Sequence, residues 1–543
     1  PGLVDWRNLD GINYLATVQN QGGCGSCCYF AVTALVETMI RIQHGFWTKR
    51  AEADLRDSWG RPCPMGAMAM DAIMWAMTNG GIADASCVPY RDVDSNYLPC
   101  GDRSGRTVRI PGGAASTVSL FTMEEQKAWL HKVGPLIVGF EIYEDWAAYA
   151  NPWSPSNPIY KHNGTAARLN PPVGHLVLVV GYDDSRGCWI LRNSWGPTWG
   201  DAGYFYIAYN SVVDDPLWPK WGLTRLNSDG FARRRHQNGN MLQSEGEGAW
   251  YHSFLLVRKG TTNSGFTELM RLGGQPGEPQ WQTWVSCVWD ADMVGQPTII
   301  ETSFNRNFEF IYWSKDGRLG HWYYSHNQLQ WFSAGKHMND HHLNGRIEGY
   351  PGFTQLSDSS FAITCRTKEG GLHHWSRGPA NSDELIWQET ISLPGTILQS
   401  GPSLVESNIG YLPSGGHLYV VAVRTDHRMQ LFWRETGLLS GPYKWHAGEI
   451  FGERIKDTPP VMIQSHFFTD DEKSFGAFQL CVVNEDGNVE HWQRQNDDIL
   501  MNPPQEGVQG RWGRMHEIKI RDTVAVRSLL HGSFNHQLEL VVE

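Results

Sequence analysis

Three side chains that could act together in nucleophilic catalysis stand far apart in the sequence. Cys27 lies in the run QGGCGSCCYF, His175 lies near the start of GHLVLVV, and Asn193 begins NSWG. A thiol acts as a nucleophile when a base lies within hydrogen-bond reach and a third group orients that base. These residue types therefore predict a Cys–His–Asn site, provided that the fold brings the three segments together.

The elements expected around these residues can bring them together. Residues 27–42 have apolar positions at helical spacing and no glycine or proline, so they predict a buried helix. The free N–H groups and the dipole of a helix N-terminus favour a thiolate at Cys27. Neighbouring strands at 176–180 and 189–191 could return His175 and Asn193 to that helix end. Further helices are predicted at 64–79 and 123–133, and further strands at 136–140 and 204–208.

Composition excludes several classes of protein. The 543 residues are 41% hydrophobic and 19% charged, so the chain can bury sizeable cores. A formal net charge of −12 argues against nucleic acid as a partner. No apolar run reaches the ~18 residues that a membrane helix needs. Adjacent histidines such as His373 and His374 would point to opposite faces of a strand, so we expect no metal and no cofactor.

The second half of the chain contains a repeat. Strand-like runs that carry Trp322, Trp375, Trp433 and Trp492 recur, each after another strand and a turn. Turns of the Asp-Gly type are typical of β-hairpins. Four strands in each unit of roughly 55 residues indicate propeller blades. Helices followed by strands in the first half indicate instead an α+β domain.

The domain boundaries follow from these changes in character. We expect an α+β domain at 1–213, a linker at 214–248 and an all-β propeller at 249–543, because the linker stretch is polar and holds an arginine triplet. Five blades are favoured if the strands AVRSLL and LELVVE complete the blade that contains TELMR. The strand HSFLLV is then left over, so a sixth, partial blade is the alternative.

Four motifs of the first domain, in order, resemble those of papain-like (cathepsin-type) cysteine peptidases. They are VDWR at 4–7, QGGCGSCCYF at 21–30, GHLVLVVGYDD at 174–184 and CWILRNSWGPTWGDAGYFYI at 188–207. The resemblance covers about the first 210 residues. It implies a two-lobed fold and hydrolysis of peptide bonds through a thioester acyl-enzyme.

The resemblance also implies a role for each motif residue. Cys27 is the nucleophile, held as a thiolate by the imidazolium of His175, and Asn193 orients the His175 ring. Gln21 and the Cys27 backbone N–H form the oxyanion hole. Trp195 shields the hydrogen bond between His175 and Asn193 from water.

Substrate contacts also follow from the resemblance. Gly66 lies on the shelf along which a substrate backbone would pair, although Met65 replaces a shelf glycine of the family. The remaining candidates are Ala67, Met68, Val173, Gly174, Leu176 and Trp195. These side chains carry no charge, which predicts a preference for an apolar substrate residue. Cys28 replaces the usual tryptophan and is expected to be a small buried thiol.

Cysteine pairing can be inferred with the help of the resemblance. A Cys24–Cys63 disulfide matches one found across the family, and Cys87 and Cys100 are close enough in sequence to close a loop. The other cysteines in strand-like surroundings are expected to be free and buried: Cys188, Cys287, Cys365 and Cys481. Paired cysteines indicate an oxidising compartment, so we expect a secreted or a vacuolar or lysosomal protein.

Other features bear on processing and partners. Asn163 begins the only Asn-x-Ser/Thr sequence and is a candidate glycosylation site. VDWR resembles the start of a mature enzyme, so an inhibitory propeptide is expected to have been removed, and a propeptide or a cystatin-like protein could inhibit the enzyme.

The repeat of the second half is similar to those of bacterial and fungal propeller lectins. Its tryptophans could fill the space between blades, or exposed ones could stack on sugars, with Trp322, Trp375, Trp433 and Trp492 as the candidates. We therefore expect a cysteine endopeptidase whose propeller binds glycans or a protein partner. The alternatives are acyl transfer to an amine by the same site, a catalytically silent papain-fold glycan-binding protein, and a propeller that only shapes the cleft.

Overall fold

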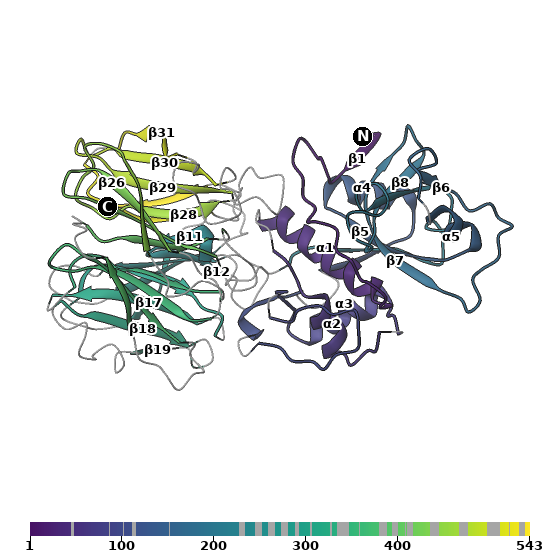
Figure 1. The fold of residues 1–543 in the computed structure, drawn as a ribbon, viewed down its shortest axis with the longest axis horizontal. Helices are drawn as coiled ribbons and strands as arrows, with labels where there is room; N and C mark the ends of the chain where they lie inside the picture. Colours follow the sequence, from purple (N-terminus) through teal and green to yellow (C-terminus); the bar gives the residue numbers. More distant parts are fainter. Residues whose placement is uncertain are drawn as a thin grey trace. The chain divides into compact units, whose positions relative to one another are not determined.

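A computed structural model shows that the chain forms two compact units, Pro1–Asp229 and Gly230–Phe467 with Ser474–Glu543 (Figure 1). The structure describes residues 1–44, 48–63, 65–85, 87–100, 103–110, 116–150, 153–226, 234–244, 252–258, 266–272, 281–287, 293–304, 307–315, 317–325, 328, 330–333, 347–357, 359–378, 388–393, 400–407, 409, 416–434, 445–465, 476–496, 511–520, 522–531 and 538–543.

The first unit has a helical part. Helix α1 (Cys27–His44) is buried along almost its whole length, as its apolar sequence predicts. It packs against α2 (Glu52–Ser58) and α3 (Ala69–Thr78). A short hairpin of β2 (Ile82–Ala83) and β3 (Thr107–Val108) and the 3-10 turn η1 (Arg103–Gly105) complete this part.

The other part of the first unit is an eight-stranded sheet in the order β4-β10-β5-β7-β8-β9-β6, with β1 also paired to β7. Its strands are β1 (Leu3–Asp5), β4 (Thr117–Leu120), β5 (Leu136–Glu141), β6 (Ile159–Tyr160), β7 (Gly174–Asp183), β8 (Cys188–Arg192), β9 (Tyr204–Ala208) and β10 (Lys220–Leu223). Two further helices are α4 (Met123–Lys132), which begins with a Thr122–Glu125 capping box, and α5 (Glu144–Ala150). The two parts confirm the expected α+β class.

The expected linker at 214–248 is largely folded in its described part. Strand β10 lies within it and pairs with β4 and β5 of the first sheet. The side chain of Lys220 on β10 is 0% exposed and contacts Asp214, Gln126 and the backbone oxygen of Val213, each at 2.8 Å. These partners compensate the buried charge, so a polar stretch can belong to a core. Arg233 and residues 245–248 lie outside the described residues.

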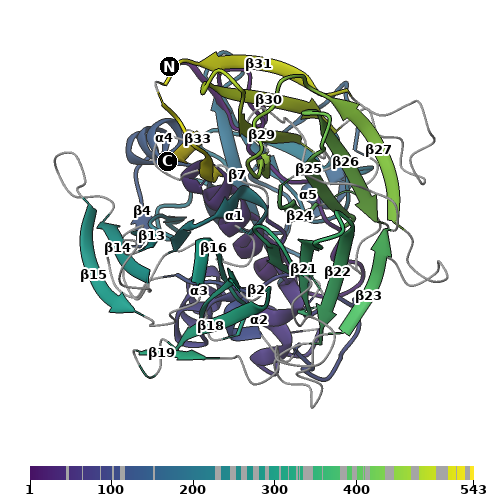
Figure 2. The ribbon, with the colours of Figure 1, turned by 90° about the vertical axis from the view of Figure 1, so that its left-hand side faces the viewer.

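In the residues that the structure describes, the second unit contains five four-stranded antiparallel sheets, which confirms the propeller (Figure 2). The sheets are β12 (Met241–Ser244), β13 (His252–Arg258), β14 (Phe266–Leu272) and β15 (Trp281–Cys287); β16 (Met293–Glu301), β17 (Phe308–Ser314), β18 (Leu319–Ser325) and β19 (Gln330–Ser333); β20 (Gly352–Gln355), β21 (Phe361–Arg366), β22 (Leu372–Arg377) and β23 (Gln388–Leu393); β24 (Ser403–Glu406), β25 (Leu418–Val423), β26 (Met429–Arg434) and β27 (Trp445–Phe451); and β28 (Val461–Ser465), β29 (Ala477–Val483), β30 (Val489–Gln495) and β31 (Gly513–Ile518).

The ring closes differently from the expectation. The strand HSFLLV is not left over, because it is β13 and pairs with β12 and β14. The C-terminal strands β32 (Val526–His531) and β33 (Leu538–Val542) pair with β11 (Gln237–Gly239) instead of completing the blade of β14. A three-stranded sheet thus stands beside the five complete blades, and it starts within the stretch expected to be a linker. The 3-10 turn η2 (Arg234–His236) leads into it, and Arg234 binds the buried carboxylate of Glu406 at 2.5 Å.

Two of the repeated tryptophans belong to the propeller core. Trp375 is 2% exposed and packs with Phe353 and Phe361. Trp433 is 5% exposed and stacks on His446 with 4.1 Å between ring centroids. Neither ring can offer a face to a sugar, so the expectation that these two bind ligand is wrong. Trp322 and Trp492 are only partly buried.

Asn238 on β11 ties the closing sheet to two blades. Its buried amide nitrogen lies 3.1 Å from Ser403 Oγ, 3.1 Å from the Leu404 oxygen and 2.9 Å from the Met462 oxygen. The amide therefore bridges β11 to the first strands of the fourth and fifth complete blades.

We expect Asn238→Ala to lower the free energy of unfolding of the second unit by about 2–3 kcal/mol, because buried acceptors lose their donor. Denaturant unfolding checks this, with Asn488→Ala as the control, since the amide of Asn488 makes an exposed hydrogen bond to Glu517. Equal unfolding midpoints for Asn238→Ala and the wild type would contradict the bridging role.

Candidate active site

Cys27 is the first residue of α1 and is free and buried, with 8% of its surface exposed. The helix N-terminus directs unpaired N–H groups toward this position. Burial raises the pKa of the Cys27 thiol, and hydrogen bonds from backbone N–H groups partly offset this effect. The first of these groups belongs to Leu176, the residue after His175. The thiol therefore lies against the start of β7.

His175 and Asn193 are brought together by strand pairing. Strands β7 and β8 are antiparallel neighbours, and Leu178 pairs with Arg192. His175 therefore lies beside the residue that follows β8, and His175 Nε2 is 2.8 Å from Asn193 Oδ1. The backbone N–H of Ser194 also donates to this oxygen at 2.8 Å. Because Asn193 Oδ1 accepts from Nε2–H, Nδ1 is the ring nitrogen left for the thiol.

Aromatic rings enclose the hydrogen bond between His175 and Asn193. Trp195 stacks on the His175 ring with 5.1 Å between centroids, and Phe140 contacts it edge-on at 5.8 Å. His175 and Asn193 are each 4% exposed. Burial lowers the pKa of the His175 imidazole to about 4, and the bond to Asn193 offsets part of this decrease. Trp195 thus lies where a shield against water would have to lie.

Gln21 begins the segment that precedes Cys27. Its backbone N–H donates to the Ser194 oxygen at 2.8 Å, and its side-chain oxygen accepts from Ser194 Oγ at 2.5 Å. Its amide nitrogen donates to the Cys24 oxygen at 2.8 Å, which uses one of its two N–H groups. The second N–H group can therefore serve an oxyanion.

The candidate substrate residues come from two stretches, the one that follows Cys63 and the start of β7. Met68 and Val173 are 40% and 43% exposed, Gly66 and Gly174 are exposed, and Ala67 and Leu176 are half-buried. Exposed apolar side chains can provide a surface for an apolar substrate residue. Cys28 is 0% exposed, and burial raises the pKa of its thiol to about 12, so it is a buried wall residue rather than a second nucleophile.

The cysteines pair as expected. Disulfides join Cys24 to Cys63 and Cys87 to Cys100, whereas Cys188, Cys365 and Cys481 are free and buried. The side chain of Cys287 lies outside the described residues. The first disulfide fixes the segment before Cys27 to the stretch that leads to Gly66.

Sequence reasoning missed two groups of the site. Ser194 holds Gln21 through both its hydroxyl and its backbone oxygen, and the backbone N–H of Leu176 lowers the pKa of the Cys27 thiol. Ser194 could have been suspected from its position after Asn193. The Leu176 contact had no signal, because any residue supplies a backbone N–H. Among the described residues, no group of three or more histidine, cysteine, aspartate or glutamate side chains could hold a metal ion.

Comparison with known proteins agrees with this geometry. Residues 1–215 match the model of the papain family cysteine proteases. Pro-cathepsin H of Bos taurus is 30% identical over 218 residues, which cover 38% of this chain and 59% of that protein. Thiol protease aleurain of Arabidopsis thaliana is 30% identical over 213 residues, covering 38% of this chain and 55% of that protein. The first unit of the chain is therefore a papain-family cysteine protease domain.

The chain spans only part of the length of these curated relatives, 59% of pro-cathepsin H and 55% of aleurain. Among solved structures, the bromelain protease of Ananas comosus bound to an inhibitor is 23% identical with a TM-score of 0.32, and the match covers 41% of this chain and 99% of that one. In the part of the chain that the structure describes, no helix is long and apolar enough to cross a membrane.

The buried imidazole of His175 makes folding stability depend on pH. Since its pKa is about 4 in the folded chain and about 6.5 when unfolded, the unfolded chain binds the proton more tightly. Stability is therefore fully present above pH ~6.5 and falls as the pH drops toward 4. We expect protonation of His175 in the unfolded chain to lower the free energy of unfolding by about 2 kcal/mol at pH 5, relative to its value at neutral pH.

Denaturant unfolding at pH 5 and pH 7 checks this expectation. His175→Gln removes the titrating group, so its loss of stability between the two pH values should be smaller than that of the wild type by this amount. His131→Gln, which removes an exposed histidine of α4, is the matched control. An equal loss for His175→Gln and the wild type would contradict the lowered pKa.

Proposed function

We propose that the chain is a cysteine endopeptidase that cleaves peptide bonds through a thioester on Cys27. The observation that supports this most directly is the 2.8 Å contact of His175 Nε2 with Asn193 Oδ1, because His175 lies on β7, which packs against the helix that begins at Cys27. The same residue types perform acyl transfer in papain-family proteases. Peptide or protein chains are the substrates.

The proposed reaction begins with transfer of the Cys27 proton to His175 Nδ1. Neither charge is stable alone in this buried place, because burial raises the pKa of the thiol and lowers that of the imidazole. The transfer creates both charges together, so their mutual attraction offsets the cost of burying them.

The thiolate then attacks the substrate carbonyl carbon, and the Gln21 amide and the Cys27 backbone N–H bind the oxyanion. The His175 imidazolium gives its proton to the leaving amine as the C–N bond breaks. Water, deprotonated by His175, then hydrolyses the thioester and restores the thiol.

The candidate substrate residues support a preference for an apolar substrate residue next to the scissile one. Met68 and Val173 are exposed apolar residues, and the other candidates carry no charge. The two disulfides support a secreted or a vacuolar or lysosomal location, since such bonds persist in oxidising compartments. An exposed Asn163, whose side-chain oxygen accepts from the Thr165 N–H at 2.8 Å, remains the glycosylation candidate.

An epoxide-type thiol reagent tests the peptidase proposal. We expect the wild-type chain to take up one label under reducing conditions at pH 5–7 and to cleave a peptide with an apolar residue in the main pocket. Cys27→Ala should take up no label. Cys28→Ala should keep the label, because Cys28 is buried and its pKa is about 12. A wild-type chain that stays unlabelled and inactive would overturn the proposal.

For the second unit we propose glycan binding beside Trp322 and Trp492. Trp492 is partly buried against Phe451, and its indole N–H donates to Glu490 Oε2 at 2.9 Å. The largely exposed Arg514 contacts the same carboxylate at 3.1 Å. A partly buried aromatic ring beside an exposed guanidinium offers stacking together with hydrogen bonds, which suits a sugar. A protein ligand is the other candidate partner.

A glycan array probed with the full chain, inactivated by Cys27→Ala, tests this proposal. We expect Trp492→Ala and Trp322→Ala each to weaken binding at least about tenfold, since one stacked ring supplies about 1–3 kcal/mol. Trp218→Ala, which removes a 39% exposed tryptophan of the first unit, is the control. Absence of binding to every sugar would leave the protein partner or a purely structural role.

A further inference from the structure

A loop outside the catalytic residues contacts the segment that precedes Cys27. This clamp loop consists of residues 90–94. Tyr90 Oη donates to the Gln21 backbone oxygen at 2.8 Å and lies 2.8 Å from Ser26 Oγ. Because a phenol has one proton, Ser26 donates to Tyr90. One hydroxyl thus joins the two ends of the segment 21–26.

The Tyr90 ring is fixed in direction. It meets Phe30 of α1 edge-on, with 4.9 Å between centroids, and the guanidinium of Arg56 lies 5.2 Å from its centre. Rotation of the ring would break both contacts. The position of the hydroxyl is therefore set by the helix that carries Cys27.

Arg56 joins the clamp loop to the first disulfide. Its side chain is 1% exposed and donates to the backbone oxygens of Arg91 at 2.8 Å and Val93 at 3.1 Å. It also lies 3.2 Å from Cys24 Sγ and 3.3 Å from Cys63 Sγ. Arg56 thus holds the backbone of the clamp loop next to the Cys24–Cys63 disulfide.

Two aspartates of the clamp loop also contact neighbouring segments: Asp92 lies against Gly22, and Asp94 lies against Cys63. A side chain at Gly22, whose φ is +61°, would place Cβ 2.4 Å from Asp92 Oδ2, so only glycine fits beneath Asp92. Asp94 Oδ1 accepts from the Cys63 N–H at 2.6 Å. The loop therefore touches both the oxyanion segment and the start of the substrate shelf.

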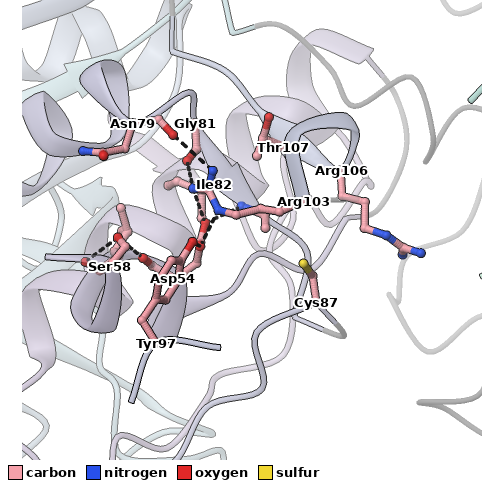
Figure 3. A network of polar contacts seen from close by, with 12 residues as sticks. Asp54, Ser58, Asn79, Gly81, Ile82, Cys87, Tyr97, Arg103, Arg106 and Thr107 are labelled. Atoms are coloured by element: carbon pink, nitrogen blue, oxygen red, sulfur yellow. Dashed lines mark hydrogen bonds and ion pairs between the residues drawn. The ribbon is translucent and has the colours of Figure 1, made fainter. Parts of the chain in front are cut away.

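A second polar network, which Figure 3 shows, holds the stretch that follows the clamp loop. Arg103 donates to both oxygens of the buried Asp54 carboxylate at 2.8 Å, and Tyr97 Oη donates to one of them at 2.9 Å. The Cys87–Cys100 disulfide closes the loop that contains residues 90–94. A rigid scaffold of this kind is what precise positioning requires.

We propose that Tyr90 is a positioning residue for the oxyanion hole. Ser194 holds the backbone N–H of Gln21 and Tyr90 holds its carbonyl, while Ser194 Oγ and the Cys24 oxygen hold its side-chain amide, so Tyr90 fixes the backbone from which the amide projects. This inference rests on the proposed peptidase function. It adds that a tyrosine without contact to substrate sets the rate of acyl transfer.

Tyr90→Phe removes the hydroxyl and keeps the ring. We expect kcat to fall and the inhibition constant of a peptide aldehyde to rise by about tenfold, a part of the effect of losing an oxyanion donor, with KM and the rate of epoxide labelling changed less than about twofold. The two probes differ because the aldehyde adduct places its oxygen in the oxyanion hole, whereas epoxide opening does not.

Tyr182→Phe is the matched control, because its hydroxyl also donates to a backbone oxygen, that of Pro1, at 2.9 Å. Unchanged aldehyde binding in Tyr90→Phe, or a parallel loss with both probes, would overturn the positioning role while leaving the peptidase proposal intact. An unlabelled wild type would instead overturn the peptidase proposal. If Tyr90→Phe does not fold, Ser26→Ala must still weaken aldehyde binding, since it removes the second partner of the hydroxyl.

Discussion

The hydrogen bond between His175 and Asn193 is the contact on which the organisation of the first unit depends. It exists because β7 and β8 pair in one register, and a shift by one residue would turn His175 to the other face of the sheet. Trp195 and Phe140 pack on the His175 ring and keep water away from this hydrogen bond, which orients the imidazole. Helix α1 packs against β7 and supplies the remaining partner from its first residue, Cys27.

Burial sets the electrostatic character of this site. The surroundings of Cys27 and His175 disfavour either charge alone, and the compensating groups are mostly dipoles: the helix N-terminus, the Leu176 N–H and the Asn193 amide. Dipoles fixed by the fold need no reorganisation when charge develops. Ser194 belongs to this set as well, because it orients the Gln21 amide from the asparagine side of the cleft.

The sequence was informative where local pattern and tertiary structure agree. The glycine-free apolar run at 27–42 became α1, and the strand-like runs became β5, β7, β8 and β9. Strand β10 was missed because Lys220 looks solvent-exposed until its partners Asp214 and Gln126 are known. The four repeated tryptophans are alike in sequence, yet Trp375 and Trp433 are buried, because neighbouring blades supply the atoms that cover them. Long-range contacts of this kind leave no local pattern, and Tyr90 illustrates the same limit within the site.

The pairing of β11 with β32 has a consequence for the order of folding. These strands are separated by almost the whole second unit, and Ser528 binds the backbone oxygen of Asn238 across a sequence separation of 290 residues. During synthesis, the first unit and the complete blades can form as they emerge, but the ring has no closing partner until β32 has left the ribosome. Until then β11 presents an unpaired edge, so closure is a late and slow event with a high entropic cost.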